Sequence, residues 1–157
     1  MIDSGKCIFH IGRCMQLTQH TDFGLRLLIV LARAGGGPVA LSAFAAEQGL
    51  SYNHVVKVAQ ALGRAGFIAS HRGRSGGVSL ARPAAGITLG EVVRALEPGL
   101  RLANCADCAL RDDCSTSSLL AEALAAFLAV LDGRSLADAA APGKPAFAPW
   151  SLVQPRG

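Results

Sequence analysis

The strongest constraint on the fold comes from residues 41–82. Two short runs with helical spacing of apolar residues are followed there directly by two strand-like runs. The first run, LSAFAAEQG, has a possible N-cap at Ser42 and a stop signal at Gly49. Ser51 can cap the second run, YNHVVKVAQALGRAG, and Gly66 can close it. Two strand-like runs, FIASHR and GVSLAR, then surround the glycine-rich turn GRSGG. Two helices with a tight link and a following hairpin indicate a winged helix-turn-helix.

Further helices are predicted on both sides of this unit. Residues 21–34 place apolar side chains on one helical face and end at the glycines of 35–37. The run ITLGEVVRALEP begins with a capping box from Thr88 to Glu91. A long helix, STSSLLAEALAAFLAVLDG, follows, and SLAD can start one more turn. The predicted fold class is mostly α, with a small β-hairpin wing and a long C-terminal helix.

The long C-terminal helix carries apolar residues at alternating steps of four and three, which is the spacing of a heptad seam. These residues are Leu120, Leu124, Phe127 and Leu131. The alternative is a helix packed on its own domain. The seam predicts that this helix dimerises.

The chain of 157 residues is long enough for one domain with a real core and an added dimerisation element. No apolar run is long enough to span a bilayer, and the N-terminus is a poor secretion signal, so we expect a cytoplasmic protein. The expected parts are a disordered extension (1–14), a DNA-binding domain (15–98), a cysteine loop (99–116), a dimerisation helix (117–140) and a disordered tail (141–157).

Basic residues are concentrated in the helix-turn-helix and the hairpin. The net charge is only +4, but no Asp or Glu lies between Gln48 and Gly90. In this layout the second helix of the motif enters the major groove and the wing approaches the backbone or the minor groove. The predicted DNA contacts are Ser51, Tyr52, Asn53, His54, Lys57, Gln60, Arg64, Arg72, Arg74, Ser75 and Gly76.

Three of the five cysteines, Cys105, Cys108 and Cys114, stand within NCADCALRDDC. A reducing cytosol disfavours disulfides, which leaves metal binding or redox sensing. The zinc interpretation is weakened because a second C-x2-C pair is absent, and no catalytic motif is found. An iron-sulfur cluster with one non-cysteine ligand and a thiol switch both remain, as does an electron-transfer module with an incidental basic segment. Nearby acidic candidates for the odd ligand are Asp107, Asp112 and Asp113.

Several motifs in order resemble the NsrR/IscR family of dimeric winged-helix regulators, and most of all its nitric-oxide-sensing repressors. They are MQLTQHTDFGLR, NHVVKV, LGRAGFIASHRGRSGGVSLARP, ITLGEVVRALEP, the loop cysteines and FLAVLDGRSLAD, which together span residues 15–140. The extension that contains Cys7 and Cys14 lies outside this match, and we interpret these two cysteines as incidental.

The resemblance implies a homodimer with crossing C-terminal helices, bound to a palindromic operator and released by nitric oxide. It implies an iron-sulfur cluster, [4Fe-4S] rather than [2Fe-2S], held by Cys105, Cys108 and Cys114 of one subunit and Asp22 of the partner subunit. The family commonly spaces its cysteines C-x5-C-x5-C, whereas this chain has C-x2-C-x5-C. A relative that senses iron or cluster supply, and a zinc or thiol switch without a cluster, are the alternatives.

Overall fold

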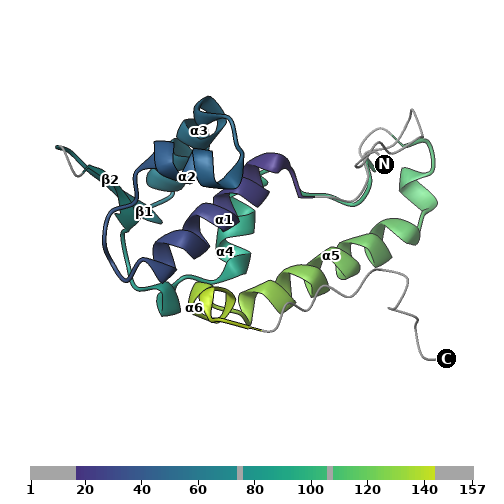
Figure 1. Ribbon diagram of the computed structural model, residues 1–157. Helices are drawn as coiled ribbons and strands as arrows, with labels where there is room; N and C mark the ends of the chain where they lie inside the picture. Colours follow the sequence, from purple (N-terminus) through teal and green to yellow (C-terminus); the bar gives the residue numbers. More distant parts are fainter. Residues whose placement is uncertain (1–16, 74–75, 106–107, 144–157) are drawn as a thin grey trace, which may run out of the picture.

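The computed structural model describes residues 17–73, 76–105 and 108–143. Its helices are α1 (Gln19–Arg33), α2 (Leu41–Gln48), α3 (Tyr52–Arg64), α4 (Leu89–Leu96), α5 (Thr116–Asp132) and α6 (Leu136–Ala140). The strands are β1 (Ile68–His71) and β2 (Gly77–Leu80), and short 3₁₀ turns are η1 (Ala84–Gly86) and η2 (Arg111–Asp113). Figure 1 shows α1 to α4 and the hairpin gathered in one body, from which α5 extends. The predicted mostly helical winged helix is confirmed.

The core lies between α1, α3 and α4. The four residues predicted for the apolar face of α3, Val55, Val58, Ala59 and Leu62, are all buried. Their neighbours in the core include Leu27, Leu28 and Leu31 of α1 and Val92 and Leu96 of α4. Each large side chain of this kind contributes about 1.5–3 kcal/mol when it is buried. Because this face of α3 is held inside, the polar face of the helix must point outward.

The link between α2 and α3 turns through Gly49, as predicted. This residue has φ +65°, and the N–H of Leu50 donates to the carbonyl of Ala45 at 2.8 Å to close the end of α2. The cap predicted at Ser42 is wrong, because α2 begins at Leu41 after Ala40 and has no side-chain cap. Backbone pairing just before Ala40 sets the direction of the chain there.

Two other helix starts also differ in detail from the expectation. Ser51 does precede α3, but its side chain makes no capping hydrogen bond. α1 begins at Gln19 rather than Thr21, because Thr18 is its N-cap and its Oγ1 accepts a hydrogen bond from the N–H of Thr21 at 3.3 Å. The regularly spaced apolar residues of this helix begin several residues after its cap. A prediction from their spacing therefore placed the start of the helix too late.

The wing is an antiparallel pair in which Ile68 faces Leu80 and His71 faces Gly77. Val39, in the segment between α1 and α2, forms an isolated bridge with Val78. The two residues exchange both backbone hydrogen bonds at 2.9 Å. This pairing fixes the wing to the helical body from its second strand.

Substitution of Gly77 by alanine is expected to destabilise the protein by about 1–3 kcal/mol, since a Cβ there would overlap the backbone of Val39. The carbonyl carbon of Val39 lies only 2.6 Å from that Cβ position. Urea unfolding measures the change, and Gly86→Ala is the matched control, because nothing lies within 4 Å of its added Cβ. Equal effects at the two positions would contradict this account of the wing.

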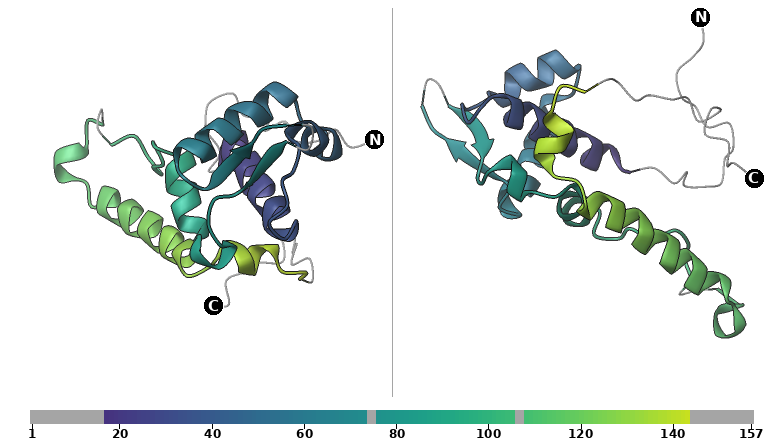
Figure 2. Two further views of the ribbon diagram at one scale, coloured as in Figure 1. Left: turned by 90° about the vertical axis from the view of Figure 1, so that its left-hand side faces the viewer. Right: turned by 90° about the horizontal axis from the view of Figure 1, so that it is seen from below.

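The C-terminal part returns to the body after α5. The capping box predicted from Thr88 to Glu91 is present in both directions, and Ser135 with Asp138 forms a second one at the start of α6. Thr88 and Ser135 pair as an isolated bridge, and Leu136 behind them is fully buried. α5 itself has no buried residue, and the right-hand view of Figure 2 shows it projecting as an arm.

Some expectations concern residues that the structure does not describe. The extension 1–14 with Cys7 and Cys14, the wing residues Arg74 and Ser75, and Asp107 lie outside the described residues, as does most of the tail 141–157. Within the described ranges, no helix is both long and apolar enough to cross a membrane.

Candidate DNA-binding face and cysteine loop

The polar face of α3 is open to solvent along its length. Every residue predicted there is exposed, namely Ser51, Tyr52, Asn53, His54, Lys57, Gln60 and Arg64. Tyr52 keeps 52% of its surface accessible, which is unusual for a large aromatic residue in a small domain. The structure thus brings the predicted set together on one surface. Amide, imidazole, ammonium and guanidinium groups on one exposed helix are suited to base edges and phosphates.

The hairpin presents fewer described contacts than the helix. Arg72 is exposed, while Gly76 is half-buried and its N–H donates to the carbonyl of Gly73 at 2.9 Å. Gly73 has φ +116°, a conformation that favours glycine, and it allows the tight turn at the tip. His71 is bonded through Nε2 to the Oγ of Ser79 at 2.7 Å, which ties the two strands together. Arg72 therefore extends from a rigid base.

The cysteine loop joins α4 to α5 and is built from consecutive turns. The N–H of Cys108 donates to the carbonyl of Cys105 at 3.4 Å, and the N–H of Arg111 donates to the carbonyl of Cys108 at 3.2 Å. Cys105 and Cys114 are half-buried and Cys108 is exposed. None of the three is in a disulfide bond. All three thiols are therefore accessible to a metal or an oxidant.

Cys114 lies at the start of α5, where backbone N–H groups lack helical partners. Hydrogen bonds from the backbone N–H groups of Thr116 and Ser117 and from the hydroxyl of Thr116 lower the pKa of the Cys114 thiol. A thiolate is the form that binds metal. No sequence pattern indicated the lowered pKa of Cys114, because it depends on where α5 begins.

The described residues do not include three His, Cys, Asp or Glu side chains already gathered as a metal site. The donor chemistry nevertheless fits an iron-sulfur cluster, because three accessible thiols stand on one loop and hydrogen bonds lower the pKa of one of them, Cys114. Among the acidic neighbours, Asp112 is paired with Arg111 at 3.2 Å and is well exposed.

Asp22 stands in the first turn of α1, not on the cysteine loop. Its carboxylate accepts hydrogen bonds from Nε and a terminal nitrogen of Arg26 at 3.0 and 2.7 Å. The pair is half-exposed, so it contributes little to stability and can exchange partners. Asp22 is thus available at the surface, as a ligand to a partner subunit would have to be.

A polar contact that the sequence did not predict links α1 to the root of the cysteine loop. The N–H of Thr18 donates to Oε1 of Glu97 at 2.6 Å, across 79 residues of sequence. Burial raises the pKa of Glu97, but hydrogen bonds from Thr18 and Thr21 outweigh it and lower the pKa overall. The start of α1 and the end of α4 are therefore joined by a carboxylate that stays ionised.

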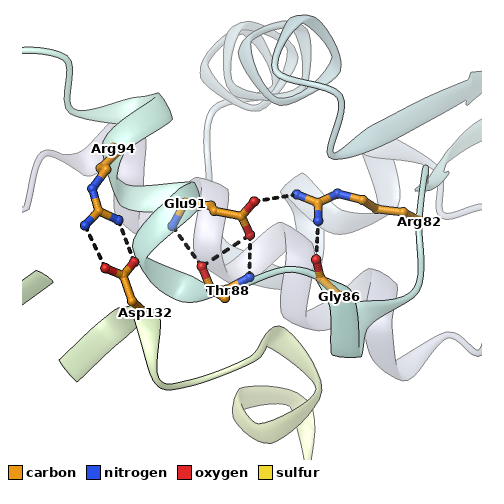
Figure 3. A network of polar contacts seen from close by, with 6 residues as sticks. All are labelled: Arg82, Gly86, Thr88, Glu91, Arg94 and Asp132. Carbon is orange, nitrogen blue, oxygen red and sulfur yellow. Dashed lines mark hydrogen bonds and ion pairs between the residues drawn. The ribbon is translucent and has the colours of Figure 1, made fainter. Parts of the chain in front are cut away.

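A second polar network holds the base of α5, and Figure 3 shows its members. Arg94 of α4 and Asp132 at the end of α5 form a two-pronged ion pair at 2.5 and 2.7 Å. On the same helix, Glu91 accepts from Thr88 and pairs with Arg82, which follows the wing, at 3.2 Å. Arg82 also donates to the carbonyl of Gly86. α4 is therefore bonded both to the segment after the wing and to the arm.

The arm shows two adjacent apolar stripes. Of the four predicted seam residues, Leu120, Leu124 and Leu131 are half-buried and Phe127 is 41% exposed. The other stripe runs through Leu119, Ala123, Ala126, Phe127 and Val130, and all five are exposed. Sequence reasoning missed Leu119 and Val130, which are 61% and 67% exposed. Their spacing from Phe127 on a helix was the signal that could have found them.

Comparison with known proteins identifies the family. The chain matches Rrf2, described as iron-dependent transcriptional regulators, over residues 17–142. The chain belongs to the Rrf2 family. Solved structures similar to this Rrf2 protein include CymR, the global cysteine regulator of B. subtilis, at 28% identity and a TM-score of 0.72, covering 83% of this chain and 100% of that one.

Two further relatives of this Rrf2 protein are similar over most of its length. The oxidised form of S. aureus CymR is 29% identical with a TM-score of 0.68, covering 83% of this chain and 99% of that one. IscR of T. potens is 30% identical with a TM-score of 0.66, covering 80% of this chain and 85% of that one. The resemblance to the NsrR/IscR family is thus confirmed at the level of Rrf2 transcriptional regulators. Because the relatives include a cysteine regulator as well as IscR, membership of the family does not by itself determine the signal or the cofactor of this chain.

Proposed function

We propose that this Rrf2 protein is a dimeric, DNA-binding repressor of the cytoplasm whose operator affinity depends on an iron-sulfur cluster and falls when nitric oxide is present. The observation that carries the proposal is the combination of an open polar face on α3 with three accessible thiols on one loop. Each part alone fits several functions. Together, on one Rrf2 chain, they fit a regulator whose DNA affinity follows a cofactor.

The DNA contact is assigned to the exposed face of α3 and to Arg72 on the wing. Asn53 and Gln60 have the amide groups that pair with adenine, while Lys57 and Arg64 can bind guanine or phosphate. All four are exposed on the helix opposite the buried Val55 and Val58. We propose that α3 enters the major groove and that the wing follows the adjacent backbone.

The cluster would be held by Cys105, Cys108 and Cys114, with Asp22 of a second subunit as the fourth ligand. When bound, it supplies irons that react with nitric oxide, most readily at the corner that has a carboxylate in place of a thiolate. The chain's own part is to link the subunits, because Asp22 is exposed at the start of α1 and must leave Arg26 to reach across. Resemblance to the nitric-oxide-sensing branch favours [4Fe-4S] over [2Fe-2S].

A dimer would place two copies of α3 against the two halves of a palindrome. The recognition helices must then lie about 34 Å apart, which is one turn of DNA. The thiol loop and the arm that would dimerise are continuous in this chain, since only the N-cap Ser115 separates Cys114 from α5. Loss of the link through Asp22 would therefore act on the same element that sets the spacing.

The test is an anaerobic visible spectrum of the purified protein, followed by stepwise addition of nitric oxide. Operator binding is followed in parallel with a DNA duplex selected from a random-sequence pool. We expect a brown protein whose cluster absorption and specific DNA binding fall together. A colourless protein that binds the duplex after anaerobic reconstitution would contradict the cluster and favour a zinc or thiol switch.

The description of the family as iron-dependent, together with the relative IscR, supports a second candidate, a regulator of the same form that senses iron or cluster supply. The same preparation separates the two candidates. A cluster that is lost on iron chelation, with a matching change in DNA binding, but that survives nitric oxide would favour the second. The exposed Cys108 is where a thiol switch would begin if no cluster is found.

A further inference from the structure

We propose that the start of α1 forms a phosphate contact on the side of α3 that faces away from the wing, in which Gln19, His20, His54 and Lys57 bind the DNA backbone. This inference rests on the proposed DNA-binding function. It adds a contact from an element outside the helix-turn-helix and the hairpin. None of the DNA contacts predicted from the sequence lies on α1.

A surface pocket of about 400 Å³ lies between the start of α1 and the outer face of α3. Gln19 and His20 line it from α1, and His54 and Lys57 line it from α3. Apolar lining comes from Phe23 and Val58, and Val58 belongs to the core. Gln19, His54 and Lys57 are exposed and His20 is half-buried, so the polar groups stand on a packed base and can be reached by a passing DNA strand.

The place of this pocket in the fold indicates its ligand. A second pocket lies on the other side of α3, between Gln60 and Arg64 of the helix and Ser70 and Val78 of the hairpin. Figure 1 shows the hairpin to one side of α3 and the purple start of α1 to the other. A helix in the major groove, which is about 12 Å wide, has a phosphate backbone on each side. The wing lies on the side of one phosphate backbone, and the start of α1 lies on the side of the other.

The charge on the α3 side of the pocket agrees with an anionic ligand. α3 has no acidic residue, and Lys57 supplies a full positive charge. Two carboxylates lie on or near the start of α1: Asp22, which is paired with Arg26 here and is the proposed cluster ligand of a partner subunit, and Glu97, which accepts hydrogen bonds from Thr18 and Thr21 and lies close enough to His20 to interact with it electrostatically. Imidazole and amide N–H groups can donate to phosphate oxygens even when they carry no charge. His20 and Gln19 can therefore donate hydrogen bonds to a phosphate without carrying a positive charge.

The experiment measures binding of the cluster-loaded, full-length protein to its selected operator duplex by fluorescence anisotropy over a salt series. His20→Ala should weaken binding by about tenfold, as the loss of a hydrogen bond to a charged group does. The loss should be the same on a mixed-sequence duplex, because phosphate contacts do not read sequence. Gln19→Lys should tighten binding and steepen the salt dependence by about 0.9 in the log–log slope.

Ala85→Lys is the matched control, because it adds the same charge at an exposed residue of η1, which packs mainly against α6 and does not line this pocket. If Gln19→Lys changes the slope no more than Ala85→Lys does, the inference is overturned. Circular dichroism shows whether His20→Ala is folded. Gln19→Lys is expected to increase DNA affinity, and unfolding of the variant could not produce such an increase.

Two further measurements separate the sources of failure. Arg64→Ala, at a residue of α3 that does not line this pocket, should weaken binding under the proposed function, so unchanged binding by this variant would reject DNA binding by α3 itself. Inorganic phosphate at constant ionic strength is the probe for a free anion. Thermal stabilisation by this phosphate that requires His20 would assign the pocket to a small anion and overturn the backbone contact.

Discussion

Replacement of Cys105 by alanine is expected to abolish the visible absorption of the anaerobically reconstituted protein and to weaken operator binding by roughly 5- to 150-fold. The reason is that only three thiols stand on the loop, and a cluster that already takes one non-cysteine ligand does not tolerate the loss of another. Absorption spectroscopy and anisotropy on the same sample measure both effects. The fold should survive, because Cys105 is only half-buried and lies outside the core.

Cys7→Ala and Cys14→Ala are the matched controls, since they remove the same group from the extension that we interpret as incidental. Both should keep the colour and the DNA affinity of the parent protein. If cluster-free Cys105→Ala protein binds the operator as tightly as loaded wild-type protein, the proposed switch is wrong.

The role of Asp22 is separable from its ion pair by a pair of variants. Asp22→Ala removes both the proposed ligand and the partner of Arg26, whereas Arg26→Gln removes only the ion pair. A ligand role predicts that Asp22→Ala alters the cluster spectrum and that Arg26→Gln leaves it unchanged. Equal effects of the two variants would reduce Asp22 to a helix-stabilising residue at the start of α1.

Structural features that depend on residues close together in the sequence could be predicted from the sequence. The burial of Val55, Val58, Ala59 and Leu62 followed from helical period alone, and this fixed which side chains of α3 face solvent. The left-handed turn at Gly49 and the capping box from Thr88 to Glu91 also depend on a few neighbouring residues. In such cases the determining contacts are close in sequence, so the sequence is sufficient.

The features that the sequence did not reveal depend on residues far apart along the chain. The bridge of Val39 to Val78 moved the start of α2 away from Ser42, and the contact of Thr18 with Glu97 joins the two ends of the domain. No period or spacing encodes either of them. The same holds for the cysteine loop, where residue type predicted the donors but only the start of α5 explains the lowered pKa of Cys114.

The position of α4 in the polar network suggests how the arm and the wing are related. Its Glu91 is bonded to Arg82 after the wing, and its Arg94 is bonded to Asp132 at the base of the arm. The hydrogen bonds with Arg94 lower the pKa of Asp132, so this ion pair stays charged at neutral pH. A change in the angle of α5 would therefore be transmitted to the helical body first through α4. The contact point is the end of α5 at Asp132, not the cysteine loop at its other end.

Phe127→Glu is expected to raise the dissociation constant of the dimer by roughly thirtyfold or more, which corresponds to about 2 kcal/mol for a central interface residue. Phe127 is 41% exposed, lies at the border of both apolar stripes on α5 and is large enough to act as an anchor. Operator binding should fall with dimerisation, since a monomer contacts one half-site. Sedimentation velocity across a concentration series measures the dimer, and Ala125→Glu on the opposite face of α5 is the matched control.

The two stripes make different predictions about which residues the partner helix covers. Asp132 follows Leu131 and is bonded to α4, so the half-buried stripe of Leu120, Leu124 and Leu131 turns toward its own domain at the base of the arm. The exposed stripe has no cover within the described chain. Val130→Glu should therefore weaken the dimer while leaving the unfolding free energy of the domain within about 0.5 kcal/mol of the parent value. If Leu120→Glu dissociates the dimer and Val130→Glu does not, the heptad seam predicted from the sequence is the interface and the exposed stripe is not.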